Sequence, residues 1–170
     1  MTYSNGGNIQ AGDSLPVTIK WENTLPDQVS NTRIQASLSG TAFDRSKVFP
    51  NGGFYRSSDN TIVWDGSSTN DLLSVLPGDS GNVSFSVGTL PDNAQTRSIR
   101  NPYVDISVTM TGARSGTDIG PVSSKQDVTV NIPSTLGLSS KAFRAIGPFG
   151  NTGPIPPKAD SESTYTITWV

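Results

Sequence analysis

Apolar and polar residues alternate along seven short stretches of the chain. In the first, Val17, Ile19 and Trp21 alternate with Thr18 and Lys20. A two-residue period turns one apolar face toward a core and one polar face toward water, as in a half-buried antiparallel sheet. The same period recurs over residues 34–38, 62–64, 83–87, 104–110, 128–132 and 165–169. We therefore predict seven strands.

Glycine and proline are concentrated between these stretches, over residues 50–53, 76–81 and 147–157. Such clusters are typical of turns. Helical composition is confined to residues 71–75 and 141–145, each about one turn long. The pattern predicts an all-β fold, an immunoglobulin-like antiparallel β-sandwich with Greek-key connections. A jelly roll is the alternative architecture.

Composition narrows the classes of function. The 170 residues are 33% apolar and 15% charged, with a net charge of −2 and no run of lysine or arginine, which argues against a nucleic-acid partner. No stretch approaches the length of about 18 apolar residues that membrane insertion needs. Cysteine and histidine are both absent, so disulfides, thiolate or imidazole metal sites and histidine-dependent triads are excluded.

The chain contains an internal likeness. Residues 11–21, AGDSLPVTIKW, align with residues 159–169, ADSESTYTITW, at an offset of 148 positions, with Ala, Thr, Ile and Trp identical. A long period of this kind is the signature of a repeat. We predict a sandwich over residues 1–133, followed by a segment, 134–170, that consists of a linker and a strand resembling the start of the next repeat.

The strand in this last segment is the candidate assembly strand. Its apolar face consists of Tyr165, Ile167 and Trp169. An amphipathic strand must bury its apolar face, either within its own sandwich or at the sheet edge of a neighbour.

A shorter echo links GDSLPVTI, residues 12–19, with GDSGNVSF, residues 78–85. We interpret this similarity as the same type of turn formed before two different strands. Glycine takes a backbone conformation that other residues avoid, and the Asp or Ser side chain caps the backbone.

The run AGDSLPVTIKWENT, residues 11–24, resembles the opening of the DUF11-like surface repeats, immunoglobulin-like modules found in tandem in bacterial and archaeal cell-surface proteins. Three further stretches fit by order: TIVWDG (61–66), LLSVLPGDSGNVSFSV (72–87) and SIRNPYVDISV (98–108). Trp21, Trp64 and the long period depart from the common pattern. The resemblance implies an extracellular or cell-surface stalk, spacer or adhesive module without catalytic residues. For Asn23 it implies a structural role, with the side chain satisfying backbone groups after the strand.

Carboxylates are the candidate catalytic groups, and Asp59, Asp65, Asp71 and Asp79 all fall in predicted loops. A glycosidase needs two carboxylates about 5–10 Å apart. Turn formation accounts for each of these four residues, so no enzyme is expected. No cofactor is expected either. Calcium is the alternative, because residues 57–71 are rich in oxygen ligands, although without a recognised order.

Exposed aromatic rings could bind a glycan by stacking, and the candidates are Phe54, Tyr55, Phe143 and Phe149. We predict a non-enzymatic structural module of a tandem-repeat cell-surface or extracellular protein, a stalk or spacer that assembles by adding its last strand to a neighbouring module. Its partners are neighbouring repeats or copies of itself. The alternatives are a subunit of a strand-exchanging extracellular fibre and an adhesin domain that binds a cell-surface glycan or protein.

Overall fold

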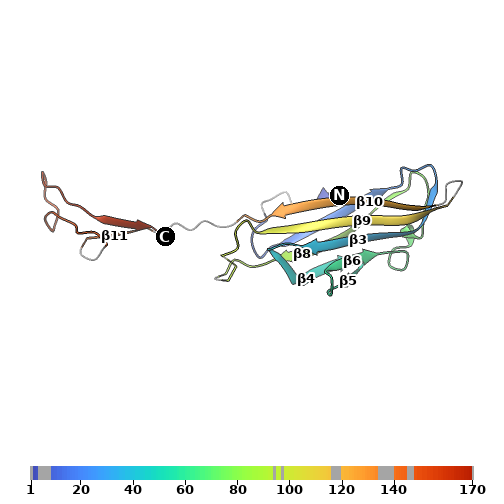
Figure 1. Ribbon diagram of the computed structural model, residues 1–170, viewed down its shortest axis with the longest axis horizontal. Helices are drawn as coiled ribbons and strands as arrows, with labels where there is room; N and C mark the ends of the chain where they lie inside the picture. The colour runs from blue at the N-terminus through green and yellow to red at the C-terminus, as the bar shows by residue number, and fades with distance from the viewer. Residues whose placement is uncertain are drawn as a thin grey trace. The chain divides into compact units, whose positions relative to one another are not determined.

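The computed structural model describes residues 2–3, 9–93, 95–96, 98–115, 120–133, 140–144 and 148–169. The chain divides into two compact units, Met1–Ser134 and Thr135–Val170, and the strands of each are coloured by position in Figure 1. The elements of the first unit are β1 (Thr2–Tyr3), β2 (Ser14–Glu22), β3 (Gln28–Ser39), β4 (Phe43–Asn51), β5 (Phe54–Arg56), β6 (Thr61–Trp64), a 3-10 helix (Asn70–Leu72), β7 (Ser74–Val75), β8 (Ser80–Thr89), β9 (Tyr103–Ser115) and β10 (Pro121–Asn131).

The first unit is built from two sheets. One has the strand order β1-β2-β8-β4, and the other has the order β10-β9-β3-β6-β5, with β7 also paired to β3. Every pairing is antiparallel. The central pairs, β2 with β8 and β3 with β9, join strands that are far apart in the chain, as Greek-key connections require. The prediction of an all-β, immunoglobulin-like sandwich is confirmed.

The inward faces of the strands form one apolar core. In β2 the buried positions alternate from Leu15 to Trp21, as the two-residue period predicts. Trp64 lies at the centre with no exposed surface, and its ring centroid is 5.9 Å from that of Phe85. The indole Nε1 donates a hydrogen bond to the Asn51 carbonyl at 3.0 Å. This bond satisfies the single polar atom of the Trp64 side chain.

The structure differs from the predicted elements in several places. Strand β4 was not predicted, and β10 begins at Pro121 rather than near residue 128. The helical composition of 71–75 yields only a short 3-10 turn followed by β7. Residue 145 lies outside the described residues, and the helical composition of 141–145 gives no helix over the rest of this stretch, because residues 141–143 belong to a strand. Its pairing with a second strand outweighs the weak local preference for helix.

The second unit contains an antiparallel hairpin of β11 (Ser140–Phe143) and β12 (Thr166–Trp169). Ser140 pairs with Trp169, and Phe143 pairs with Thr166. The predicted strand 165–169 is therefore present from Thr166 onward, with Tyr165 just before it, and its hydrogen-bonded partner in the described part of the chain is β11. The segment after the sandwich thus holds a pair of strands, where the sequence had indicated one.

Candidate functional site

The apolar face of the candidate assembly strand is exposed in the second unit. Tyr165 is 48% exposed, Ile167 is 61% exposed and Trp169 is 71% exposed. The polar residue between them, Thr166, is only 5% exposed. The hairpin therefore turns a threonine inward and leaves its β-branched and aromatic side chains without cover.

A polar loop holds the inward face of the hairpin. The Asn151 side-chain amide donates hydrogen bonds to the carbonyls of Phe143 and Arg144, at 3.2 and 3.1 Å, and lies 3.1 Å from the Thr166 hydroxyl. Asn151 therefore joins β11 to β12 through its side chain, which explains why Thr166 is the buried residue of the strand.

Arg144 contacts the segment that leads into β12. Its Nη1 donates to the Thr164 carbonyl at 3.1 Å, and its Nη2 donates to the Gly153 carbonyl. The guanidinium carbon lies 5.3 Å from the centre of the Tyr165 ring, within the range of a cation–π contact. The hairpin is thus held in shape by polar contacts, while its apolar face stays open.

Strand β2 carries the matching residues in a different setting. Val17, Ile19 and Trp21 are all buried in the core of the sandwich. Strand β8 pairs along the whole of β2, from Ser14 opposite Gly88 to Glu22 opposite Ser80. Gly81 is the partner of Trp21, and a Cβ added there would lie 2.5 Å from the indole ring. The bare backbone of Gly81 makes room for the tryptophan.

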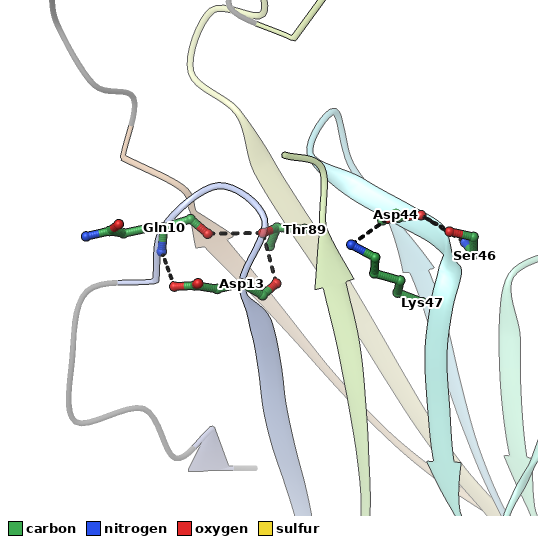
Figure 2. A network of polar contacts seen from close by, with 6 residues as sticks. All are labelled: Gln10, Asp13, Asp44, Ser46, Lys47 and Thr89. Carbon is green, nitrogen blue, oxygen red and sulfur yellow. Dashed lines mark hydrogen bonds and ion pairs between the residues drawn. The ribbon is translucent and has the colours of Figure 1, made fainter. Parts of the chain in front are cut away.

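The two GDS turns have the same geometry, as predicted. Gly12 has φ = 92°, the Asp13 amide donates to the Gln10 carbonyl at 3.1 Å, and the Asp13 carboxylate accepts from the Gln10 amide at 2.9 Å (Figure 2). Gly78 has φ = 83°. Asp79 repeats both bonds with Leu76, at 3.0 and 2.8 Å. Glycine is favoured at both positions because its φ is positive.

A third turn, which shares the positive φ and the backbone hydrogen bond of the GDS turns, precedes β12. Asp160 has φ = 57°, and the Ser161 amide donates to the Lys158 carbonyl at 3.3 Å. Lys158, Asp160 and Ser161 stand 148 positions after Gln10, Gly12 and Asp13. The backbone turn therefore recurs at the same offset as the sequence likeness.

Thr89 connects the first of these turns to the end of β8. Its amide donates to the Asp13 carbonyl at 2.9 Å, and its hydroxyl contacts the carbonyls of Gln10 and Asp13 at 3.1 and 3.0 Å (Figure 2). Thr89 is fully buried. In the sandwich, β8 thus pairs with β2, and Thr89 at the end of β8 also fixes the turn that leads into β2.

Asn23 has the structural role that the resemblance implies. The side chain is 6% exposed, and its amide donates to the carbonyls of Asp27 and Val75 at 3.0 and 3.1 Å. Its Oδ1 accepts from the Leu25 amide at 3.1 Å. Asn23 therefore satisfies three backbone groups where the chain leaves β2.

The carboxylates of Asp59, Asp65 and Asp79 each have a local structural partner. Asp59 pairs with Arg56, and Asp79 caps the Leu76 amide at 2.8 Å. Hydrogen bonds from the hydroxyl and amide of Ser67 hold the pKa of Asp65 below its ordinary value. Asp71 lies in the first turn of the 3-10 helix. Within the described ranges, no three acidic side chains come together as a metal site would need.

The aromatic candidates are divided between the two units and differ in exposure. Phe54 and Phe149 are largely exposed but belong to different units. Tyr55 is half-buried, and its hydroxyl donates to Asn60 at 3.2 Å. Phe143 is also half-buried.

Asp44 lies in an irregular part of β4, where the register with β8 shifts between Asp44 and Val48. Its Oδ1 accepts from the Ser46 hydroxyl at 2.6 Å and the Ser46 amide at 3.0 Å, and its Oδ2 lies 3.6 Å from Lys47 Nζ (Figure 2). The hydrogen bond from the Ser46 hydroxyl is the main cause that lowers the pKa of Asp44.

This lowered pKa predicts a loss of stability in acid. A carboxyl whose pKa is lower when folded stabilises the protein above the pKa of the unfolded chain, about 3.9, and this contribution is lost as the pH falls through the folded pKa. We expect Asp44→Asn to reduce the fall in melting temperature between pH 5 and pH 2. Thermal unfolding followed by circular dichroism at several pH values measures this. An unchanged acid dependence in the variant would contradict the assignment.

No protein-family model matches the chain, and the comparison with curated proteins found no match. Among the residues that the structure describes, no helix is long and apolar enough to cross a membrane.

Proposed function

We propose that the chain is a non-enzymatic structural module of a tandem-repeat extracellular or cell-surface protein. Its sandwich is a spacer, and its second unit joins it to a neighbouring module by strand addition. The observation that carries the proposal is the recurrence, 148 positions apart, of one turn followed by one strand pattern, once inside a complete sandwich and once in an exposed hairpin. Recurrence of this kind is expected of modules in series.

The directions of the outer strands support a linear arrangement. Strand β1 runs antiparallel to β2, toward the end of the sandwich where Ser14 begins β2. Strand β10 ends at Asn131, opposite Tyr103, and the Tyr103 carbonyl accepts from Ala42 beside that same end. The first and last strands of the sandwich therefore run in the same direction, which suits modules placed end to end.

The open face of β12 also bears on the fibre alternative. In a strand-exchanging fibre, copies of this chain would bind one another through Tyr165, Ile167 and Trp169, and an open head-to-tail contact of this kind generates filaments. In a spacer, the same face binds a neighbouring module, and the chain by itself is monomeric in solution.

Sedimentation velocity at increasing protein concentration distinguishes these functions. We expect the full chain to be monomeric, and a variant with Tyr165, Ile167 and Trp169 all changed to Ser to sediment in the same way. We also expect the sandwich of this variant to melt at an unchanged temperature, because the substitutions lie in the second unit. Polymers that form with the natural chain and disappear in the variant would overturn the spacer function in favour of the fibre.

A further inference from the structure

We infer that β12 takes the place of β2 in a second sandwich, and that its free edge accepts an antiparallel strand of the β8 pattern from a further module. This inference rests on the proposed function and names the partner of the candidate assembly strand by its chemistry. The strand that pairs with this edge alternates apolar and polar residues and has a glycine opposite Trp169.

Strand β12 matches β2 in sequence, in the turn before it and in its pairing. Thr166, Ile167 and Trp169 repeat Thr18, Ile19 and Trp21 at the offset of 148. The turn before each strand has a positive φ and the same backbone hydrogen bond at that offset. Each strand also pairs antiparallel with a strand that precedes it in the chain, β1 with β2 and β11 with β12.

In the described part of the second unit, β12 has one paired neighbour, whereas β2 has two. In the sandwich, β2 has β1 on one edge and β8 on the other. The described hairpin pairs β12 with β11 on one edge. The side chains that are buried in β2 are half to three-quarters exposed in β12. An edge strand with an uncovered apolar face is a template for pairing with another strand.

The register of β2 with β8 indicates which residues the strand that pairs with β12 must carry. Val17 pairs with Phe85, Ile19 with Val83, and Trp21 with Gly81. Transferred by 148 positions, this register places an aromatic residue opposite Tyr165, a β-branched residue opposite Ile167 and glycine opposite Trp169. A threonine at the end of that strand would bind the turn at 158–161, as Thr89 binds the turn at 10–13.

The topology of the sandwich indicates whether a folded copy of this chain could supply the strand that pairs with β12. In the folded sandwich β8 lies between β2 and β4 and is paired with both. A folded copy of the chain could not donate β8 without breaking both ladders. The strand that pairs with β12 is therefore the β8-type strand of a further module, which the hairpin of β11 and β12 completes.

A hybrid chain tests the inference. In this hybrid, residues 23–133 of the chain are appended directly after Val170. The join is placed there because Val170 stands 148 positions after Glu22, the last residue of β2. We expect the hybrid to fold as two sandwiches, with a calorimetric heat of unfolding roughly twice that of the natural chain, since this heat scales with the number of folded residues. The same hybrid with Tyr165, Ile167 and Trp169 changed to Ser should leave the appended segment unfolded.

A matched control keeps a negative result informative. In the control hybrid, residues 165–170 are replaced by VTIKWE, the natural β2 sequence of residues 17–22. If this control forms a second sandwich and the β12 hybrid does not, β12 is not equivalent to β2 and the inference fails.

A synthetic peptide provides a second measurement on the natural chain. The probe is SGNVSFSVGT, the sequence of β8. We expect it to reduce the quenching of tryptophan fluorescence by acrylamide, because Trp169 is exposed whereas Trp21 and Trp64 are buried. A peptide with serine in place of Val83 and Phe85 should have no effect. If the β8 peptide also has no effect and neither hybrid folds, the inference is overturned. Sedimentation of the natural chain tests the spacer function separately.

Discussion

Replacing Trp64 with alanine is expected to lower the free energy of unfolding by about 3–5 kcal/mol, the range for removing a large aromatic side chain from a core. Trp64 has no exposed surface, packs against Phe85, and donates a hydrogen bond to the Asn51 carbonyl. The turn at Gly53 lies directly against the indole, since a Cβ there would be 2.5 Å from Nε1. The variant therefore loses packing on several sides and leaves the Asn51 carbonyl without its partner.

Urea unfolding of the full chain, followed by far-ultraviolet circular dichroism, measures this effect. Trp169→Ala is the matched control, because the same side chain is removed from a position that is 71% exposed and lies in the second unit. We expect the control to change the stability of the sandwich by less than about 0.5 kcal/mol, as for most surface substitutions. A loss below about 1 kcal/mol for Trp64→Ala would contradict the central position of Trp64 in the core.

The strands that could be predicted are those with one buried face. In β8 and β9, the apolar positions that alternate in the sequence are the positions that the core buries, except that Met110 at the end of the alternation is half-buried. Strand β4 escaped prediction because its bulge and Pro50 interrupt the alternation. The first half of β10 was missed for a different reason. It is an edge strand, and residues 123–127 are exposed on both faces, so no periodic signal marks it.

The candidate site was predicted in part. The sequence identified Tyr165, Ile167 and Trp169 as one face of a strand, and this alternation follows from the backbone alone. It could not show that this face is exposed, because exposure depends on which strand lies alongside. The pairing with β11 was also hidden, since the composition of 141–145 indicated helix. The turn at Asp160 did leave a signal, because aspartate stands where Gly12 stands in the match and tolerates a positive φ better than most residues.

The turn before β12 therefore adds weight to the sequence likeness. Four identities in eleven residues can arise by convergence among strands, because strands share composition. A backbone turn with a positive φ and an amide-to-carbonyl bond at corresponding positions is an independent similarity. Together they explain why the second unit has a well-formed turn and strand but an uncovered face.

Replacing Asn23 with aspartate is expected to lower the free energy of unfolding by about 2–4 kcal/mol, since it removes two buried hydrogen bonds and adds a buried charge. The carboxylate can still accept from the Leu25 amide. It cannot donate to the carbonyls of Asp27 and Val75, which would face a negative charge instead. The loss should be smaller at low pH, because a protonated carboxyl group can donate one of the two bonds.

The control for this substitution is Asn82→Asp, which makes the same change of charge at an exposed position of β8. We expect that variant to keep its stability within about 0.5 kcal/mol. Urea unfolding of both variants at pH 7 and pH 4 separates the effect of the lost bonds from that of the charge. Equal stabilities for the two variants would show that Asn23 does not secure the chain where it leaves β2. A loss confined to Asn23→Asp, and reduced at pH 4, would establish that its amide holds the segment between β2 and β3 against β7.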